Sequence, residues 1–505
     1  MHFEGGRKIE FSSCFYRFEP LCVAATTRQT SIHQPIPKLL LVNYSLRYHN
    51  YSLIYNIVPL ILFYYLRSFI NLPIHESRCK LCRLRFQICL HTLGVSLETA
   101  FRIIVSNLTG TTVLSRNSIE SADPSKRPWY MKGGTRRPYS AIKSHRTGRR
   151  LARLWPDEDA YDDRVTNQLM YVPADYNKSN VEHQLKKIMV PHGMPEAKAG
   201  PDIFLQLRCP VNTCTIVRDN PEEADLVLFK DYVTHVGRRS PSQVWMLYFL
   251  ECPYHTQSVK NAIINWTATY RRDSDIVAPY ERWQYYDARV TQISQTFNYA
   301  ANKTKKVAWF VSNCHPRNQR MHYAKELSKY IQVDIYGTCG ALRCPRSQSQ
   351  ACFDMLDEDY KFYLAFENSN CKDYITEKFF VNGLGHNVLP IVMGAHPTDY
   401  ARSAPYRSYI HVDEFESPKE LAGYLHRLDR DDELYNSYFR WKGTGEFINT
   451  YFWCRVCAML HDNRPPKFYK DVNEWWRGDS VCTTTSWREH DLALPTANLM
   501  NYERS

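Results

Sequence analysis

Glu377 and Lys378 are neighbouring side chains that could stabilise a nucleotide leaving group. A fixed lysine offsets the negative charge that develops on a diphosphate as its bond to the transferred group breaks, and a glutamate can accept hydrogen bonds from ribose hydroxyls. The pair lies within residues 362–394, whose pattern predicts a buried strand, a polar turn, a short helix and a second buried strand. This order puts the pair beside the carboxyl end of a parallel strand, where open α/β sheets bind nucleotides. The segment predicts a transferase for nucleotide-activated substrates, although a single lysine or glutamate on a helix is more often a solvated surface residue.

Arg317 and Arg320 are further candidate contacts for phosphate. They fall where a predicted strand, 306–311, gives way to a predicted helix, 318–330. Guanidinium groups and helix N-termini both suit phosphate. Neither a GxGxxG nor a GxxxxGK[ST] loop occurs in the sequence, which argues against dehydrogenases and P-loop enzymes.

Glu251 is the candidate general base. It follows a predicted strand, 243–250, and Pro253 comes directly after the Glu251-Cys252 pair and ends that strand. The carboxylate should therefore project from the edge of a sheet, where it could take a proton from an acceptor hydroxyl. The alternative is an exposed edge glutamate without a chemical role.

Two patterns resemble metal sites. Asp273 and Asp275 have the DxD spacing by which metal-dependent glycosyltransferases hold a divalent ion, but they directly follow two arginines that could neutralise them. The CxxC pairs at 79–82 and 454–457 have zinc-like spacing but are far apart and lack a partner pair. We interpret the acids as ion-pair partners and the cysteines as disulfides. A metal-dependent transferase of another fold, using Asp273 and Asp275, is the alternative.

The 16 cysteines and several N-glycosylation sequons favour an oxidising lumen. The glycosylation candidates are Asn107, Asn177, Asn265 and Asn302. The cysteines predict disulfides whose connectivity does not follow from the sequence. The disulfide candidates are Cys339, Cys344, Cys454, Cys457 and Cys482.

The N-terminal region contains one candidate membrane anchor. Residues 53–66 are apolar and are followed by Arg67, but this run is shorter than the roughly 20 residues of a spanning helix. We interpret about 51–67 as a signal anchor, and a buried segment is the alternative. The net charge of +12 is concentrated at 126–153, which holds many basic and no acidic residues. We interpret this run as a solvated, poorly ordered linker rather than a nucleic-acid patch.

At 505 residues the chain is too long for one core. Alternating buried strands and helical patterns from about residue 200 onward predict two α/β lobes with a cleft between them. The strands predicted for the first lobe are 203–207, 215–217, 225–229 and 243–250. Those predicted for the second are 306–311, 333–337, 362–366, 388–393 and 409–412, with helices at 318–330, 417–428 and 431–441.

Taken together, the motifs resemble the α1,3-fucosyltransferases, glycosyltransferase family 10, over roughly residues 200–490. The resemblance rests on Glu251-Cys-Pro and on four longer segments. These are NWTATYRRDSDIVAPY (265–280), VAWFVSNCHPRNQR (307–320), VDIYG (333–337) and, most specifically, FENSNCKDYITEKFF (366–380).

The resemblance implies a GT-B arrangement of two Rossmann-like lobes, a GDP-fucose donor and transfer with inversion. It makes Glu251 the base. It sets Asn368 and Tyr374 against the fucose and diphosphate, Glu377 against the ribose, and Lys378 and Arg317 against the diphosphate. The resemblance implies no required cofactor or metal, although stimulation by Mn²⁺ is compatible with it. Cys252 departs from the family pattern, which more often has serine or asparagine after the base.

Within the family, SNCHPRNQR, the CRVC segment at 454–457 and CTTTSWRE at 482–489 are most similar to the core-modifying branch. That branch adds fucose to O3 of the innermost, asparagine-linked GlcNAc of glycoprotein N-glycans. The alternatives are a Lewis-type enzyme acting on antennal GlcNAc and a sugar-nucleotide-binding protein without turnover.

The expected domain organisation follows from this reading. We expect a cytoplasmic tail, anchor and basic stem at 1–160, an acceptor-side lobe at 161–300, a donor-binding lobe at 301–460 and a cysteine-containing extension at 461–505. The expected location is the Golgi membrane, as a single-pass type II protein with a lumenal catalytic region, and no nucleic acid is expected as a partner.

Overall fold

The computed structural model describes residues 126–138, 153–174, 176, 185–191, 194, 197–234 and 237–493. The chain divides into two compact units, Met1–Thr109 and Gly110–Ser505, and every described residue belongs to the second. The candidate anchor, Asn107, Asn177 and the CxxC pair at 79–82 lie outside the described residues. Within the described ranges, no helix has the length and apolar character needed to cross a bilayer.

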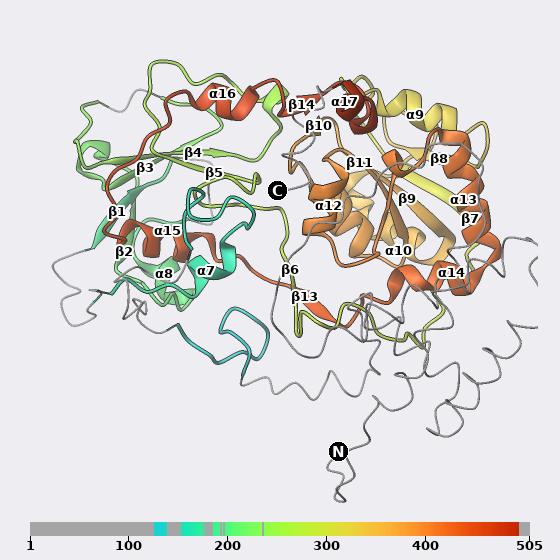
Figure 1. Cartoon of the computed structure of the whole chain (residues 1–505), viewed down its shortest axis with the longest axis horizontal. Helices are drawn as coiled ribbons and strands as arrows, with labels where there is room; N and C mark the ends of the chain where they lie inside the picture. Colours follow the sequence, from blue (N-terminus) through green and yellow to red (C-terminus); the bar gives the residue numbers. More distant parts are fainter. Residues whose placement is uncertain are drawn as a thin grey trace, which may run out of the picture. The chain divides into compact units, whose positions relative to one another are not determined.

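The first lobe is built on a parallel five-stranded sheet with the order β2-β1-β3-β4-β5 (Figure 1). Its strands are β1 (Lys186–Met189), β2 (Cys214–Val217), β3 (Leu226–Lys230), β4 (Val244–Phe249) and β5 (Trp266–Thr269). Successive side chains of β3 alternate between two cores: Leu226 and Leu228 pack into one, Val227 and Phe229 into the other. Burial on both faces explains why β3 and β4 read as continuous apolar runs. The lobe also contains α7 (Val165–Leu169), α8 (Asp202–Gln206), η3 (Pro221–Glu223) and η4 (Pro253–His255).

The second lobe is built on a parallel sheet with the order β12-β11-β9-β7-β8. Its strands are β7 (Lys305–Phe310), β8 (Val333–Tyr336), β9 (Tyr360–Phe366), β11 (Leu389–Met393) and β12 (Ile410–His411). All residues of β9 are buried, because the chain packs helices against both faces of the sheet. The principal helices are α9 (Arg320–Leu327), α10 (Ser349–Asp359), α11 (Glu377–Phe379), α12 (Pro397–Ser403), α13 (Pro418–Arg430) and α14 (Asp432–Asn436). Shorter turns are η5 (Arg346–Gln348), η6 (Phe380–Leu384), η7 (Val412–Glu414) and η8 (Ser437–Phe439).

The C-terminal part of the chain returns to the first lobe. β13 (Gly445–Phe447) pairs with β6 (Trp283–Tyr285), and α15 (Phe452–Leu460) then packs beside α7 and α8 (Figure 1). The disulfides Cys209–Cys454 and Cys214–Cys457 fix α15 there. α16 (Val472–Arg477) packs against η4, β14 (Cys482–Thr483) pairs with β10 (Asn370–Cys371), and α17 (Trp487–Ala493) ends the described chain. The structural first lobe therefore includes α15, which the expected boundaries had given to the second.

The predicted pair of Rossmann-like lobes is confirmed, but the predicted strand at 203–207 is wrong. Residues Asp202–Gln206 form the helix α8, in which Phe204 is buried and Leu205 is 53% exposed. Pro201 precedes the first helical residue and favours a helix start there. A short apolar run does not distinguish a strand from a helix by periodicity alone, which is the reason for the error.

Part of the basic run also differs from the linker interpretation. Trp129, Tyr130 and Met131 are buried in the first-lobe core, and the Trp129 indole donates to the Leu169 carbonyl at 3.1 Å. Leu154 and Trp155 join the same core. Residues 126–138 and 153–160 thus pack against the first lobe instead of forming a solvated stem.

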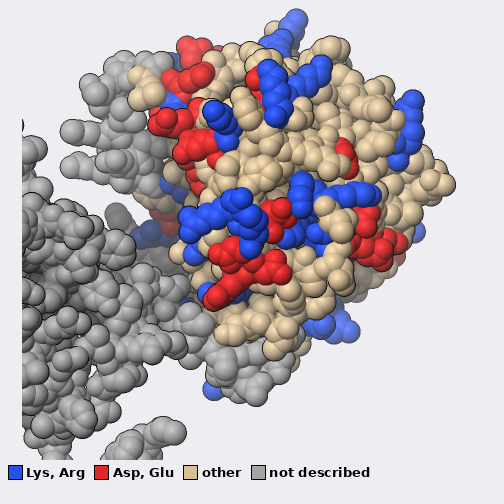
Figure 2. All heavy atoms as spheres, turned by 90° about the vertical axis from the view of Figure 1, so that its right-hand side faces the viewer, with Lys and Arg blue, Asp and Glu red and all other residues tan. Residues whose placement is uncertain are grey.

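Charges of both signs are interspersed on the face of the molecule drawn in Figure 2. In the second lobe, Asp429 pairs with Lys306 at 2.9 Å and with Lys361 at 3.2 Å. Paired charges of this kind do not form the one-sign surface by which proteins bind nucleic acid.

Candidate active site

The candidate site lies at the switch point of the second sheet. From β7 the chain runs outward to β8 and then returns across β7 to β9, so the strand order reverses between β7 and β9. Ligands of open α/β sheets bind outside the carboxyl ends of the strands at such a point. The loop after β7 carries Arg317, and the loop after β9 carries Asn368, Tyr374 and Lys378.

Glu251 follows β4 of the first lobe and contacts the second. Its Oε1 accepts hydrogen bonds from the Tyr374 hydroxyl at 2.6 Å and from Asn368 Nδ2 at 3.2 Å. The backbone N–H of Cys252 donates to the same oxygen at 3.1 Å. The side chain of Glu251 is 46% exposed. The carboxylate is therefore held by three donors and still open to an acceptor hydroxyl.

These donors keep Glu251 ionised. Burial alone would raise the pKa of this carboxyl group, but the hydrogen bonds from Tyr374, the Cys252 amide and Asn368 outweigh burial and leave the pKa below its ordinary value. A carboxylate that is ionised at neutral pH can accept a proton.

Lys378 is held by a carboxylate that sequence reasoning had missed. Its Nζ lies 3.2 Å from Oε2 of Glu367, which is fully buried, and 3.0 Å from Oε1 of Glu377. Burial alone would lower the pKa of Lys378, but the two carboxylates outweigh it and raise that pKa above its ordinary value. The lysine is therefore a fixed cation with one side open, its side chain being 25% exposed.

The space for Glu367 is created by a glycine. A Cβ added at Gly394 would lie 2.5 Å from Cγ of Glu367, and the φ of Gly394 is 156°. Glu367 also accepts from the backbone N–H of Thr376 at 2.8 Å and from its hydroxyl at 2.9 Å. Thr376 in turn caps α11, the short helix that begins with Glu377 and Lys378. The available signal was an acidic residue placed directly after the apolar strand β9.

Asn368 is partly buried and has an unused acceptor. Its Nδ2 donates to Glu251, while its Oδ1 is buried and meets no donor within the part of the chain that the structure describes. A buried amide oxygen without a partner is costly, so this atom is suited to accept from a ligand hydroxyl.

The two arginines differ in what they contact. The Arg317 side chain is exposed, and its guanidinium lies 4.7 Å from the ring centre of Tyr254, a residue of η4. Arg320 is buried, and its terminal nitrogens donate to the carbonyls of Phe366 at 2.7 Å and Asn313 at 3.1 Å. Because these nitrogens join the loop after β7 to the last residue of β9, Arg320 supports the site instead of contacting phosphate as expected.

Tyr280 is a second residue that sequence reasoning had missed. Its hydroxyl donates to the Leu250 carbonyl at 2.9 Å. Burial and then the charges of Glu367, Glu377 and Glu251 raise its pKa well above the ordinary value. The same tyrosine therefore lies near the candidate base and near both carboxylates that hold Lys378.

The acidic pair at 273–275 is engaged by cations of the chain. Asp273 Oδ2 lies 2.6 Å from Arg271 NH2 and 3.3 Å from Lys372 Nζ. Asp275 is fully buried, pairs with Lys467 and accepts from the backbone N–H of Thr267. These contacts agree with the interpretation of the pair as ion-pair partners.

The described sequons differ in accessibility. Asn302 is exposed in a turn. Asn265 is 8% exposed, and its Nδ2 donates to the Lys467 carbonyl at 2.7 Å. A glycan on Asn265 would break that bond, so the folded chain disfavours this candidate.

The expected disulfides are present. Each of the five candidate cysteines is half of a disulfide. Besides the two disulfides of α15, the described residues form Cys314–Cys339, Cys344–Cys352 and Cys371–Cys482. Cys454 and Cys457 both pair with first-lobe cysteines, so the CRVC segment is not a zinc half-site.

A carboxylate from one α/β lobe contacts the lysine-bearing loop at the switch point of the other. This arrangement defines the class of two-lobed transferases for nucleotide-activated sugars. Residues 183–281 match the family described as "Fucosyltransferase, N-terminal", and residues 300–475 match "Glycosyltransferase family 10 (fucosyltransferase) C-term". The chain belongs to glycosyltransferase family 10, the fucosyltransferases, as the motifs predicted.

Individual relatives agree with this assignment. The chain is 60% identical over 381 residues to glycoprotein 3-alpha-L-fucosyltransferase A of Drosophila melanogaster, covering 72% of this chain and 75% of that protein. It is 35% identical over 306 residues to alpha-(1,3)-fucosyltransferase C of the same organism, covering 54% and 71%. A crystal structure of an alpha1,3-fucosyltransferase with GDP-fucose aligns over 56% of this chain and 92% of that chain, with 16% identity and a TM-score of 0.38.

Proposed function

We propose that this fucosyltransferase moves L-fucose from GDP-fucose in α1,3 linkage to the innermost core GlcNAc of glycoprotein N-glycans. The observation that carries the mechanism is the contact of Glu251 with Tyr374 and Asn368, which brings a carboxylate of one lobe to the lysine-bearing loop of the other. The glycoprotein acceptor is supported by the 60% identity to a relative named as a glycoprotein 3-alpha-L-fucosyltransferase.

The proposed step is a single displacement at C1 of fucose. The Glu251 carboxylate takes the proton of the acceptor O3 hydroxyl as the bond between that oxygen and C1 forms. The bond from C1 to the diphosphate oxygen breaks on the opposite face, and GDP leaves with the bonding electrons. Attack and departure on opposite faces invert the configuration at C1, so a β-linked donor gives an α-linked product.

The chain supplies the cations for the leaving group. Lys378, fixed by Glu367, offsets charge on the diphosphate, and Arg317, which is exposed on the loop after β7, is the second cation for it. Asn368 Oδ1 accepts from a fucose hydroxyl, and Glu377, which is 51% exposed, accepts from the ribose. Tyr374 holds both the base and the donor-facing loop.

The proposed step uses no divalent ion. The carboxylates of Asp273 and Asp275 are already engaged by Arg271, Lys372 and Lys467. Transfer should therefore persist in excess EDTA, with Mn²⁺ giving at most a modest stimulation. Loss of transfer in EDTA that Asp273→Ala reproduces would favour the metal-dependent alternative.

We further propose a lumenal catalytic region held to the Golgi membrane by the segment at 51–67. The five disulfides among the described residues are typical of an oxidising compartment, and Asn302 is an exposed acceptor for a glycan. Protease added to sealed vesicles should leave residues 126–493 intact, and digestion before detergent is added would contradict this topology.

The acceptor is tested with the full chain, GDP-fucose and a glycopeptide of defined structure. Mass spectrometry of the product should show one added deoxyhexose on fragments that contain the innermost GlcNAc. A deoxyhexose found on antennal fragments instead would point to the Lewis-type alternative. Release of GDP without a fucosylated product would indicate hydrolysis of the donor and no acceptor activity.

A further inference from the structure

Glu251, Cys252 and His255 bring three different metal-ligating side chains together beside the candidate site. One ligand atom from each lies within 4.8 Å of the others. His255 Nδ1 is 3.4 Å from Cys252 Sγ and 3.6 Å from Glu251 Oε1. All three come from one short segment, the loop after β4 and the turn η4, so they are close in sequence as well as in space.

The 3.4 Å separation of Cys252 Sγ and His255 Nδ1 matches that of two neighbouring ligands in a tetrahedral zinc site. Zinc bonds of about 2.3 Å to sulfur and about 2.0–2.2 Å to nitrogen or oxygen place neighbouring ligand atoms about 3.4–3.6 Å apart. We propose that Glu251, Cys252 and His255 form a binding site for a thiophilic divalent cation such as Zn²⁺, with a fourth position open to solvent. Binding releases the thiol proton of Cys252 to solvent, because the thiolate is the ligand.

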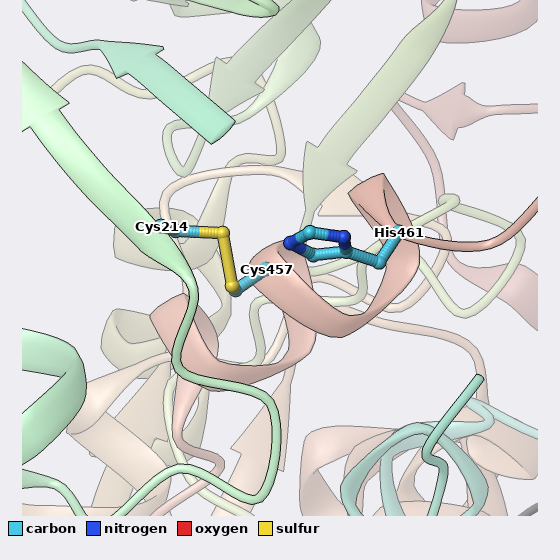
Figure 3. A group of neighbouring side chains, drawn as sticks. All are labelled: Cys214, Cys457 and His461. Carbon is cyan, nitrogen blue, oxygen red and sulfur yellow. A yellow bond between two sulfur atoms is a disulfide. The ribbon is translucent and has the colours of Figure 1, made fainter. Parts of the chain in front are cut away.

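A second group of cysteine and histidine side chains lacks the ligands for zinc. Cys214, Cys457 and His461 also gather in space, but the two sulfurs are joined in a disulfide (Figure 3). A disulfide sulfur offers no thiolate, so that group lacks the ligands for zinc. Cys252 is buried and free, and the other described cysteines are all paired.

The described surroundings of the cluster engage only one of the two carboxylate oxygens of Glu251. The hydrogen bonds from Tyr374, Asn368 and the Cys252 amide all reach Oε1 of Glu251, so Oε2 remains available as a ligand. The Cys252 thiol also contacts Ser369, whose Oγ lies 3.0 Å from its Sγ. The side chain of His255 is 39% exposed, which gives the cation a path from solvent.

A cation at this position would inhibit transfer. This consequence rests on the proposed function, in which Glu251 accepts the proton of the acceptor hydroxyl. A carboxylate bound to Zn²⁺ has lost the electron pair needed for that step, and the open fourth position lies where the acceptor must approach. The site is therefore inhibitory and reversible, and removal of the cation restores activity.

Binding is tested with Co²⁺, which reports a thiolate ligand by a charge-transfer absorption band in the near ultraviolet. The full chain should develop this band on titration with Co²⁺ and lose it when Zn²⁺ is added. Cys252→Ser should abolish the part of the band that Zn²⁺ removes, and His255→Gln should weaken Co²⁺ binding by at least about tenfold. His322→Gln, at an exposed histidine of α9, should change nothing. An unchanged band in Cys252→Ser would overturn the site.

Inhibition is tested on the same variants. Zn²⁺ should inhibit fucosyl transfer by the parent chain, EDTA should restore it, and the concentration for half inhibition should rise at least about tenfold in Cys252→Ser and His255→Gln. Equal zinc sensitivity of parent and variants would overturn the proposal. Site-dependent binding of Zn²⁺ without inhibition would leave the metal site standing and would instead remove Glu251 from its role as base.

Discussion

At the scale of residues, the Tyr374 hydroxyl sets the acidity of the candidate base. Its hydrogen bond of 2.6 Å is among the contacts that hold the pKa of Glu251 below its ordinary value. Tyr374→Phe removes this bond and should raise that pKa. Because Glu251 acts as its carboxylate, the acidic limb of the profile of kcat/KM against pH should move to higher pH, by about one pH unit.

The matched control is Tyr323→Phe. The Tyr323 hydroxyl is buried without a hydrogen-bond partner among the described residues, so its loss should leave the acidic limb unchanged. An acidic limb at the same pH in Tyr374→Phe and the parent would mean that another group controls it.

Glu367 is proposed as a positioning residue, because it acts on the donor through Lys378. Glu367→Gln removes the buried charge 3.2 Å from the lysine. Lys378 then loses its fixed orientation, and kcat should fall by about tenfold to a hundredfold while KM for GDP-fucose also rises. Steady-state kinetics at several donor concentrations separate the two parameters.

Glu377→Gln is the control for that prediction, because Glu377 also pairs with Lys378 but is half-exposed. It should raise KM, through the proposed contact with the ribose, and change kcat little. If kcat for Glu367→Gln equals that of the parent, Glu367 does not position Lys378 for the reaction.

The sequence identified some of these residues and missed others for physical reasons. Glu251 lies two residues before Pro253, and Lys378 lies at the start of a helix. Both features can be recognised in the sequence. Glu367 gives no comparable signal, because its burial depends on the absence of a side chain at Gly394. Gly394 follows β11, whereas Glu367 follows β9. The pattern predicts that Arg320 contacts phosphate because it cannot show that the carbonyls of Asn313 and Phe366 occupy the terminal nitrogens of this arginine.

At the scale of elements, the loop between β10 and α11 contains a buried acid that couples stability to pH. Burial and the neighbouring carboxylate of Asp399 raise the pKa of Asp373 from 3.8 to about 7. Between these values the folded chain holds a proton that the unfolded chain has lost, so stability should fall as pH rises from about 4 to about 7.

Asp373→Asn removes this titration while keeping a residue that tolerates the positive φ of 58° at this position. The free energy of unfolding of the variant minus that of the parent should therefore be larger at pH 7.5 than at pH 5. The expected increase in this difference is on the order of 2 kcal/mol. Thermal unfolding at both pH values measures this, with Asp479→Asn at an exposed site as control. A constant difference between variant and parent would contradict the assignment of the shift to Asp373.

The Cys371–Cys482 disulfide ties the donor loop to β14. The bond closes a loop of 111 residues and lies in the β10–β14 pairing. Replacing both cysteines with serine should lower the free energy of unfolding by about 2–5 kcal/mol and raise KM for GDP-fucose, because the loop after β9 loses its anchor. Cys344 and Cys352 are separated by only 8 residues. Replacing both with serine should lower the free energy of unfolding by less and leave the KM for GDP-fucose unchanged. Equal effects of the two pairs would contradict this role.

Most strands of both sheets could be predicted from the sequence, whereas β5 and the return of α15 to the first lobe could not. β3, β4, β7, β9 and β11 are buried on both faces and therefore read as apolar runs. Residues Trp266–Thr269 form β5 but lie in the mixed run NWTATYRR, which gives no continuous apolar signal. The return of α15 to the first lobe depends on disulfides that join residues more than 240 positions apart, a pairing that spacing alone does not give.

At the scale of the whole molecule, the return of the chain explains how two lobes hold one site. α15 is bound to the first lobe by Cys209–Cys454 and Cys214–Cys457, and β14 is bound to the second-lobe loop by Cys371–Cys482. Glu251 then reaches Tyr374 and Asn368 from the opposite lobe. Base and donor loop are therefore positioned by covalent links as well as by packing.

The central claim is that Glu251 removes the proton from the acceptor hydroxyl while the second lobe holds the donor. Glu251→Gln keeps the shape and can still accept hydrogen bonds through its amide oxygen, but it has no carboxylate to take the proton. The most direct measurement is single-turnover transfer of fucose from GDP-fucose to the defined glycopeptide, alongside the binding affinity for GDP-fucose. The account predicts a rate at least about a hundredfold below that of the parent, with donor affinity retained. Transfer by Glu251→Gln at the parental rate would contradict it.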